Sequence, residues 1–336
     1  MRKNVKILIC GLGSIGQRHY TNLVKLGYRD IIIYRTGKGA NQDFVNAFIQ
    51  KNQPVIFNDL AAALKAKPDI VFVTNPTSLH ARTALAAARS GSHIFVEKPL
   101  ADVLSGELAK LQKAVVGGKR KLFVAYHFRF HPLLKKVKKM LETGQIGTPL
   151  SVNVQMGERV SNWHPWEDYK KSYSSKKELG GGVVLTQSHD LDYLSWLLGP
   201  AKSVTAKGGT RGGLGINVED SVDMLLSHAS GVESLVHLDY VQSPGVRTLL
   251  IVGTRGRLFL NFNEGKLEVQ KYDKKLPTVY QVPAKFDRNQ MYVDEVEYFM
   301  SCIDNNKRPF NDLSEAIPFL KFLLAIKKQL TYGPKK

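Results

Sequence analysis

The chain of 336 residues is 43% hydrophobic and 23% charged, and it carries a formal net charge of +19. Its length exceeds the roughly 250–300 residues at which one hydrophobic core stops growing, so we expect two domains. The composition excludes a disordered or collagen-like chain, and no apolar stretch reaches the roughly 20 residues of a membrane helix. The apolar run at residues 5–10 is too short for a signal peptide, and Cys10 and Cys302 offer neither zinc spacing nor a disulfide framework. These features predict a soluble, cytoplasmic protein without a metal site or a membrane partner.

The positive charge is concentrated between Lys110 and Met140, where basic residues occur without a single acidic one. Three interpretations stay open: a face for nucleic acid or another polyanion, a solvated helix surface, or a field that attracts an anionic small substrate. No zinc-finger, recognition-helix or aromatic RNA-binding signature accompanies the charge. A nucleic-acid partner is therefore disfavoured.

Short apolar runs alternate with helical patterns in the first third of the chain. We expect strands at residues 6–10, 31–34, 55–57, 70–73, 93–96 and 122–125. Helices are expected at residues 17–26, 43–50, 60–66 and 81–90. Near-continuous apolar strands separated by helices indicate a parallel sheet covered on both faces. The pattern predicts an α/β fold whose residues 1–123 form a doubly wound Rossmann domain.

Alternating apolar and polar residues replace this pattern from Leu150 onwards. Expected strands cover residues 150–155, 218–227, 233–240, 248–252 and 267–272, with a flexible connection at 208–215 and a hairpin turn at 230–231. Expected helices cover residues 182–198, 293–304 and 318–330. Residues 124–336 are thus predicted to form a second, α+β domain with an open, largely antiparallel sheet and helices on one face.

A glycine fingerprint follows the first strand. Gly11, Gly13 and Gly16 enclose Leu12, Ser14 and Ile15 in the pattern G-x-G-x-x-G, between a predicted strand and a predicted helix. The first glycine permits a tight turn, the second lets the backbone approach a pyrophosphate, and the third lets the helix pack on the strand. The helix N-terminus supplies amide donors for phosphates. We predict a dinucleotide site that includes Ser14 and Ile15.

The second strand is followed by arginine instead of an acidic residue. Sites for NAD usually carry Asp or Glu about 20 residues after the glycines, on the ribose 2′-hydroxyl. Here Arg35 stands at that place, with Thr36 and Lys38 close behind it. An arginine can hold a 2′-phosphate in bidentate geometry, or it can stack on the adenine. The sequence favours NADP and leaves NAD possible.

Several blocks occur in an order that resembles the glucose–fructose oxidoreductase / inositol dehydrogenase (Gfo/Idh/MocA) family. These blocks are residues 71–80, 93–100, 126–132, 144–147, 180–192, 294–299 and 307–309. The resemblance covers nearly the whole chain. It implies a Rossmann domain, a C-terminal domain that shapes the substrate site, and a homodimer or homotetramer built through the sheet.

The resemblance also implies roles for individual residues. Lys98 matches the lysine that hydrogen-bonds the reacting hydroxyl, and His189 matches the histidine that is the candidate general acid or base. A cationic lysine can steady a developing alkoxide or relay a proton. Further cofactor contacts are expected from Asn75, Pro76, Thr77, His80, Glu97, Lys98 and Arg129.

The chain departs from the family at one position. Many members carry an aspartate three or four residues before the histidine, where this chain has Leu185 and Thr186. Either Lys98 and His189 suffice, or Asp190 or Asp192 takes over, or the activity differs from simple alcohol oxidation. Asp192 lies one helical turn after His189, so it could orient the imidazole as part of the catalytic set, or it could have a structural role.

An aromatic segment precedes the glycines at 180–182. Trp163, Trp166, Asp168, Tyr169 and Tyr173 combine ring faces that stack on sugar C–H surfaces with a carboxylate for hydroxyls. Together with Tyr126, Thr186 and His189 they are the predicted substrate-binding residues. A packed aromatic lid without ligand contact is the alternative.

Three functions are compatible with these residues. The first is an NAD(P)-dependent oxidoreductase that acts on a hydroxyl or ketone of a sugar, inositol or nucleotide sugar. The second is a cofactor-binding regulator without turnover, which the missing aspartate favours. The third is an epimerase or hydrolase that oxidises its substrate transiently with a tightly held cofactor.

Overall fold

The computed structural model describes residues 4–39, 41–164 and 167–332. The chain divides into two compact units. The first comprises Met1–Tyr126, Glu178–Gly180 and Tyr292–Lys321, and the second comprises His127–Lys177, Gly181–Met291 and Phe322–Lys336. The sequence predicted one domain boundary, after residue 123. The two units differ from this prediction, because the segment Tyr292–Lys321 belongs to the first unit.

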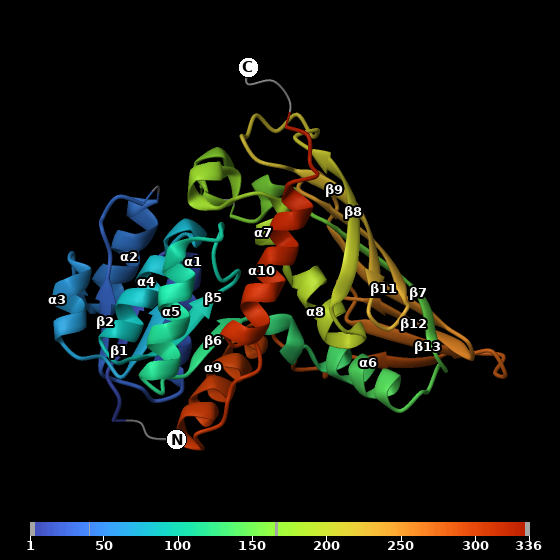
Figure 1. The fold of residues 1–336 in the computed structure, drawn as a ribbon, viewed down its shortest axis with the longest axis horizontal. Helices are drawn as coiled ribbons and strands as arrows, with labels where there is room; N and C mark the ends of the chain where they lie inside the picture. The colour runs from blue at the N-terminus through green and yellow to red at the C-terminus, as the bar shows by residue number, and fades with distance from the viewer. Residues whose placement is uncertain (1–3, 40, 165–166, 333–336) are drawn as a thin grey trace. The chain divides into compact units, whose positions relative to one another are not determined.

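The first unit is built on a six-stranded parallel sheet with the strand order β3-β2-β1-β4-β5-β6. Its strands are β1 (Ile7–Cys10), β2 (Ile31–Tyr34), β3 (Val55–Phe57), β4 (Ile70–Val73), β5 (His93–Glu97) and β6 (Leu122–Ala125). The strands β1, β4, β5 and β6 are almost fully buried, as continuous apolar runs require when helices cover both faces. The predicted doubly wound α/β fold is confirmed (Figure 1).

Helices cover the first sheet on both faces. They are α1 (Ser14–Lys25), α2 (Gln42–Asn52), α3 (Leu60–Lys65), α4 (His80–Arg89), α5 (Gly106–Gly117) and α9 (Asn289–Asp304), and α10 (Leu313–Lys327) begins in this unit. On one face His19 of α1 packs against Phe72 and Phe95, and Phe299 of α9 packs against Phe95 and Phe123. These aromatic contacts bring the late helix α9 onto the N-terminal sheet.

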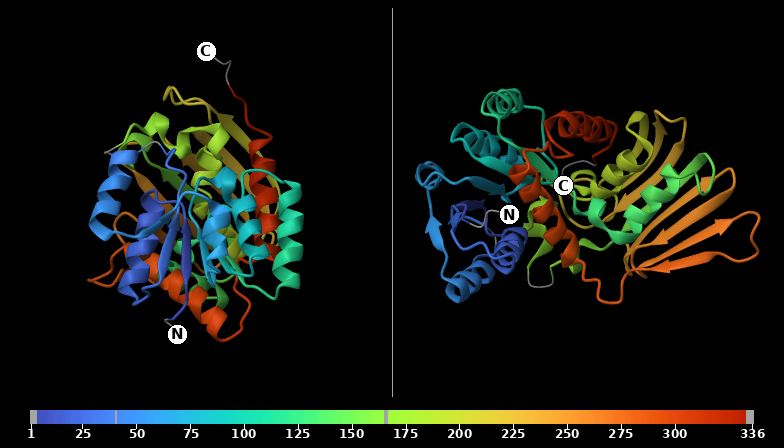
Figure 2. Two further views of the ribbon diagram at one scale, coloured as in Figure 1. Left: turned by 90° about the vertical axis from the view of Figure 1, so that its left-hand side faces the viewer. Right: turned by 90° about the horizontal axis from the view of Figure 1, so that it is seen from below.

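The second unit is built on an eight-stranded sheet with the order β14-β13-β12-β11-β7-β10-β9-β8 (Figure 2). Its strands are β7 (Pro149–Gly157), β8 (Ala201–Gly209), β9 (Ser221–His228), β10 (Glu233–Asp239), β11 (Val246–Gly253), β12 (Gly256–Asn261), β13 (Lys266–Lys271) and β14 (Thr278–Gln281). Every pair is antiparallel except β7 with β10. The predicted largely antiparallel sheet is confirmed.

One face of this second sheet is buried and the other is open. In β9, Met224 and Leu226 are buried while Asp223 and Leu225 are exposed, as the two-residue period of a half-covered strand requires. The helices α6 (Pro132–Glu142), α7 (Val183–Thr186) and α8 (His189–Leu198) belong to this unit. Among the described residues no helix is both long and apolar enough to cross a membrane.

Several elements differ from the sequence expectations, and helices α5 and α6 and strands β12 and β14 were not predicted at all. The expected helix at 182–198 is two helices, interrupted between Thr186 and His189. The expected helix at 318–330 starts at Leu313 and holds Pro318 inside it, because burial of apolar residues such as Leu320 outweighs one lost backbone hydrogen bond. Strand β8 was not expected; its outward side chains are polar and it ends in the glycines expected to form a flexible connection.

Candidate active site

The carboxyl ends of β1, β4 and β5 lie side by side, because these three strands are neighbours in the first sheet. Chain order reverses between β1 and β4, which is where doubly wound sheets bind their ligands. The segments that leave these ends are the glycine loop, Thr74–His80 and Glu97–Pro99. The sheet thereby gathers most of the residues expected to bind the cofactor.

The glycine loop has a backbone that other residues could not adopt. Gly11 has a φ of +109°, and a Cβ on it would lie 2.7 Å from the backbone nitrogen of Asn75. A Cβ on Gly16 would lie 2.1 Å from the carbonyl oxygen of Gly11. A Cβ on Gly13, in contrast, would meet nothing within 4 Å. Two glycines are therefore needed for packing, and the space beside the third is open to a ligand.

Helix α1 begins at Ser14, directly after Gly13. No side chain caps its N-terminus, and its first turn holds no acidic residue. Its first backbone amides have no partner within the helix, so this end can accept a phosphate. The donor set therefore fits the diphosphate of a dinucleotide.

The arginine expected at the ribose follows the end of β2. The Arg35 backbone amide donates to Phe57, and its guanidinium donates to the side chain of Gln42. Thr36 and Lys38, which follow it, are exposed. This segment presents positive charge and no carboxylate beside the glycine loop.

The loop after β4 is tied to the loop after β5 through His80. Its Nδ1 lies 2.8 Å from the carbonyl oxygen of Pro99, and its Nε2 lies 2.8 Å from that of Asn75. Burial lowers the pKa of His80. Asn75 in turn donates to Thr83 at 2.9 Å. The described contacts of His80 thus hold the two loops together, and its predicted cofactor contact stays a prediction.

Lys98 directly follows β5 and is partly exposed. Its backbone amide donates to Oε2 of the preceding Glu97 at 3.3 Å. The other oxygen of Glu97, Oε1, lies 2.6 Å from Nε2 of His19. The lysine is thus anchored to a buried carboxylate at the sheet edge where the cofactor is expected.

In the second unit His189 is the first residue of α8 and is buried. Its ring lies against His127 at 4.3 Å and against Phe128 at 5.2 Å between centroids. An imidazole enclosed by other rings has a fixed orientation, which general acid–base chemistry requires.

The carboxylate of Asp192 faces an arginine. Arg129 donates to it through Nε at 2.9 Å and through the terminal nitrogen at 2.7 Å, and both side chains are buried. This bidentate pair joins the segment His127–Phe130 to α8. It supports the structural role for Asp192 that the sequence left open, and it occupies the guanidinium that was expected to contact the cofactor.

A second ion pair lies one residue earlier on α8. Asp190 accepts from the hydroxyl of Tyr193 at 2.9 Å and lies 3.3 Å from Arg247 of β11. Complete burial raises the pKa of Asp190, and the arginine opposes this. Arg247 also lies over the ring of Phe128 at 4.5 Å. Arg247 was not predicted, because nothing in its strand pattern marks it as buried.

Thr186, at the position of the family's aspartate, has a buried hydroxyl. It donates to the carbonyl oxygen of Gly182 at 2.9 Å and is hydrogen-bonded to the hydroxyl of Tyr240. The ring of Tyr240 packs edge-on against Trp163 at 5.1 Å. The indole N–H of Trp163 is buried and finds no acceptor among the described residues. A ligand hydroxyl could therefore serve as its acceptor.

Tyr169, Asp168 and Tyr173 are less enclosed than Thr186. The hydroxyl of Tyr169 donates to Leu214 at 2.9 Å, while Asp168 is exposed and caps a short helical turn. Tyr173 is also exposed. Trp166 lies outside the described residues. Tyr126 belongs to the first unit, where its ring packs on Phe319.

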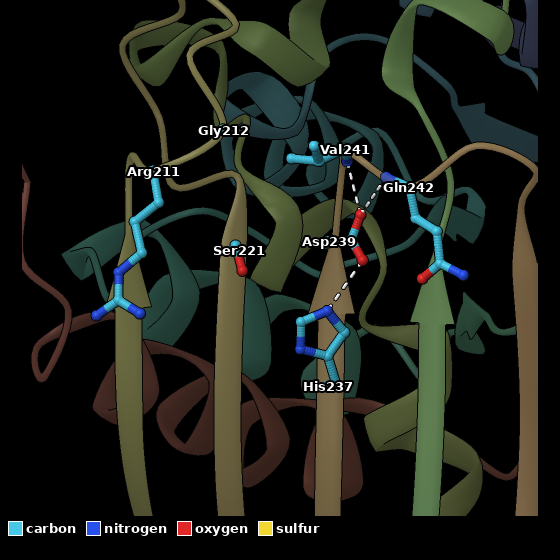
Figure 3. A pocket seen from close by; sticks show the side chains of 7 residues that line it. All are labelled: Arg211, Gly212, Ser221, His237, Asp239, Val241 and Gln242. Atoms are coloured by element: carbon cyan, nitrogen blue, oxygen red, sulfur yellow. Dashed lines mark hydrogen bonds and ion pairs between the residues drawn. The ribbon is translucent and has the colours of Figure 1, made fainter.

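A cavity of about 330 Å³ opens at the end of β9 and β10 (Figure 3). In it His237 lies between two carboxylates, 2.9 Å from Asp239 and 2.7 Å from Asp223. These hydrogen bonds, led by that of Asp239, raise the pKa of His237 to about 9. Asp239 also accepts the amides of Val241 and Gln242. The cluster is self-contained and holds none of the predicted site residues.

Two protein-family models match the chain, one after the other along the sequence. A domain described as "Oxidoreductase family, NAD-binding Rossmann fold" matches residues 5–126, and the "GFO/IDH/MocA C-terminal domain" matches residues 134–259. The chain belongs to the Gfo/Idh/MocA family.

The chain is similar in sequence to several curated dehydrogenases and oxidoreductases. Scyllo-inositol 2-dehydrogenase (NAD(+)) of Bacillus subtilis is 25% identical over 323 residues, which cover 92% of this chain and 89% of that protein. The uncharacterized oxidoreductase YrbE of the same organism is 29% identical over 62% of this chain, and levoglucosan dehydrogenase of Pseudarthrobacter phenanthrenivorans is 29% identical over 65% of it. The matches span only 58% and 63% of those two relatives.

Solved structures of the family share the fold over nearly the full chain. Levoglucosan dehydrogenase in complex with NADH and levoglucosan has a TM-score of 0.82 at 20% identity and covers 97% of this chain and 96% of its own. The WlbA dehydrogenase of Bordetella pertussis in complex with NADH and UDP-GlcNAcA has a TM-score of 0.79 at 23% identity and covers 98% and 96%. These likenesses establish the Gfo/Idh/MocA fold.

Proposed function

We propose that this chain is a nicotinamide-dependent dehydrogenase or reductase that acts on a CH–OH group or ketone of a small carbohydrate. The observation that carries the proposal is the place of Lys98, which directly follows β5 at the sheet end that also holds the glycine loop. Family membership supports the same reaction class. The relatives named as inositol and levoglucosan dehydrogenases support a polyhydroxylated substrate.

The chain's own residues fit a dinucleotide. The open space at Gly13 and the uncapped start of α1 suit a diphosphate, and Arg35 suits a ribose phosphate. When bound, the nicotinamide ring supplies the donor or acceptor of a hydride. The remaining task of the protein is to bind the substrate and to control the proton of the reacting oxygen.

We assign that task to Lys98 and His189. In the oxidising direction a C–H bond breaks with loss of a hydride, a C=O bond forms, and the hydroxyl proton goes to the imidazole. The lysine donates a hydrogen bond to the reacting oxygen and stabilises its developing negative charge. The ring contacts of His189 and the backbone hydrogen bond of Lys98 support this assignment, because each holds one of the two residues in place within its own unit.

A carbohydrate substrate is favoured by the groups around Thr186. A buried indole N–H on Trp163, the hydroxyls of Thr186 and Tyr240, and aromatic ring faces provide hydrogen-bond partners and stacking surfaces for a sugar. Tyr169 and Tyr173 extend the same aromatic set. These residues carry the proposed specificity for sugars, inositols or nucleotide sugars.

The experiment is an assay of purified protein with NADP⁺ and NAD⁺ against a panel of sugars, inositols and nucleotide sugars. Absorbance of the reduced nicotinamide reports turnover. The variant Lys98→Met should show turnover reduced roughly 10²- to 10⁴-fold. Its cofactor binding, measured by fluorescence, should persist. Normal turnover of this variant on the true substrate would contradict the assignment.

A regulator without turnover is the second candidate, and Thr186 is the observation that favours it. A hydroxyl bonded to Tyr240 cannot carry charge or act as a base in place of the aspartate. If this candidate is correct, the protein binds NADP⁺, but no ligand that co-purifies with the protein reduces the bound NADP⁺. Mass spectrometry of that ligand, followed by single-turnover reduction, separates the two candidates.

We also propose that the open face of the second sheet joins two copies of the chain. Leu225 and Leu235 are 44% and 55% exposed on this face, and they line a hollow of about 290 Å³ together with Leu250 and Val252. Contiguous exposed apolar side chains are typical of an interface. A homodimer, alone or as half of a homotetramer, would cover them.

A further inference from the structure

A buried cluster of three titratable side chains in the first unit includes Glu97, the residue before Lys98. It consists of His19 from α1, Glu97 at the end of β5 and Glu295 from α9. One side-chain nitrogen or oxygen atom of each residue lies within 4.8 Å of the corresponding atoms of the other two. His19 and Glu97 are in direct contact at 2.6 Å.

Glu295 is the unusual member of this cluster. It is completely buried, and neither oxygen of its carboxyl group has a hydrogen-bond partner among the described residues. The surroundings are apolar, because His19 is packed between the rings of Phe72, Phe95 and Tyr292. An ionised carboxylate without a partner is one of the most costly groups to bury.

The charges of the cluster favour a proton on Glu295. The imidazole of His19 contacts Glu97 at 2.6 Å, whereas neither oxygen of Glu295 is hydrogen-bonded to a cationic side chain among the described residues. The other charged group nearby on α1 is Arg18, whose guanidinium lies over the ring of Tyr292 at 4.5 Å. On α9 itself the flanking acids are Asp294 and Glu297. Burial, together with the negative charge of Glu97, raises the pKa of Glu295 well above its ordinary value.

Glu97 connects this cluster to Lys98. One oxygen of its carboxyl group contacts His19, and the other accepts the backbone amide of the lysine. We propose that Glu295 is a neutral carboxylic acid in the native protein and a positioning residue for Lys98, which acts through the pair of Glu97 and His19. The neutral acid lets Glu97 keep its charge and its place, whereas a second carboxylate would repel it. The assignment to Lys98 rests on the proposed function; the protonation of Glu295 does not.

Infrared spectroscopy tests the protonation directly. The wild-type protein near neutral pH should show the carbonyl stretching band of a buried carboxylic acid, shifted in D₂O and absent from Glu295→Gln. Glu297→Gln is the matched control, because it removes an acid from the same helix at a partly exposed position. A spectrum without this band, or a band unchanged in Glu295→Gln, overturns the proposal.

The pH dependence of unfolding gives a second readout that needs no substrate. A carboxyl group with a raised pKa in the folded state binds its proton more tightly there than in the unfolded chain, so stability falls as pH rises above the ordinary value of 4.5. Between about pH 5 and pH 9 the melting temperature of wild type should therefore fall more than that of Glu295→Gln. Equal slopes in the two proteins contradict a buried neutral acid.

Turnover tests the positioning role. Glu295→Leu should lower kcat roughly 10- to 100-fold, as small displacements of catalytic groups do, without a matching change in KM for the cofactor. Glu295→Gln should recover part of this loss, because its amide keeps the size and neutrality of the acid. Equal losses in both variants overturn the positioning role. A stoichiometric metal ion found by elemental analysis in wild type and absent from Glu295→Gln would overturn the proton assignment.

Discussion

Arg35 is the side chain on which we expect cofactor choice to depend. It directly follows β2, and its guanidinium is oriented by Gln42. One charge-assisted hydrogen bond contributes ~1.5–3 kcal/mol, so Arg35→Ala should weaken NADP(H) binding roughly 10- to 150-fold and NAD(H) binding little. Fluorescence titration with both cofactors measures this.

The control for Arg35 is Arg89→Ala, which removes an exposed arginine at the end of α4. It should leave both affinities unchanged. Equal affinity of wild type for NADP(H) and NAD(H) would refute the preference that Arg35 is expected to confer.

Asp192 is the side chain for which the structure favours stability over catalysis. Its carboxylate and the guanidinium of Arg129 are both buried, so Asp192→Asn leaves a buried positive charge without its partner. Breaking such a pair costs about 3–5 kcal/mol. Chemical denaturation should show this loss, and the pH–rate profile should keep its optimum.

A double replacement tests the same pair. The double variant Arg129→Met/Asp192→Leu should recover much of the stability that Asp192→Asn loses, because an apolar pair carries no desolvation cost. A downward shift of the pH optimum in Asp192→Asn with unchanged stability would instead support orientation of His189 by this carboxylate.

Helix α1 depends on two glycines in different ways. Gly16→Ala places a Cβ against the backbone of Gly11, so it should cost about 1–3 kcal/mol and also weaken cofactor binding. In Gly13→Ala the new Cβ meets no atom within 4 Å, so the free energy of unfolding should change by less than about 0.5 kcal/mol. The affinity for the cofactor should fall. Thermal unfolding and cofactor titration of the two variants measure the difference. Similar stability losses in both would show that the loop is not held as described.

Strands β9 and β10 share a pH-dependent contact. His237 faces Asp223 across the pair and also contacts Asp239, and its pKa is raised to about 9 from an ordinary 6.5. Because the folded state binds this proton more tightly, the stabilisation is complete below pH 6.5 and is lost as pH rises towards 9. His237→Gln should remove that part of the stability curve, so the variant and wild type should converge near pH 9. A constant difference in melting temperature from pH 6 to pH 9 would argue against the ion pair.

Helix and strand positions were predicted best where burial is uniform. The strands Ile31–Tyr34, Ile70–Val73 and Leu122–Ala125 have the expected bounds, because a short buried apolar run fits a parallel sheet that is covered on both faces. The edge strand Val55–Phe57 also has the expected bounds, although Val55 is exposed. Helices α5 and α6 were not predicted from the sequence. Both overlap the basic segment between Lys110 and Met140. Their exposed charges hid the apolar stripe that each helix buries.

The proposed oligomer concerns the molecule as a whole. Leu235→Lys on the open sheet face should convert a dimer into monomers, because a charge buried at an apolar interface has no partner. Sedimentation velocity or light scattering measures the change. Val116→Lys is the control, since this exposed residue lies on α5 in the first unit and should leave the oligomer intact. A monomeric wild type would contradict the proposed interface.

The candidate site was predicted in part. The glycine loop, Arg35 and Lys98 could be located from sequence because each directly follows an apolar strand, and parallel strands end at one edge of the sheet. The partners of Asp192, Thr186 and Asp190 could not be located in this way. Arg129, Tyr240 and Arg247 lie far from them in sequence, and sequence spacing carries no information about such pairs.

The sequence by itself determined the two-part architecture, the dinucleotide loop and the family, because strand burial, glycine geometry and motif order are local properties of the chain. Only the tertiary structure decided that α9 returns to the first sheet, that Asp192 pairs with Arg129, and that Glu295 lies beside Glu97 and His19 without a hydrogen-bond partner among the described residues. These contacts join segments far apart in sequence. Their energies depend on burial and on neighbouring charges, which arise only when the chain is folded.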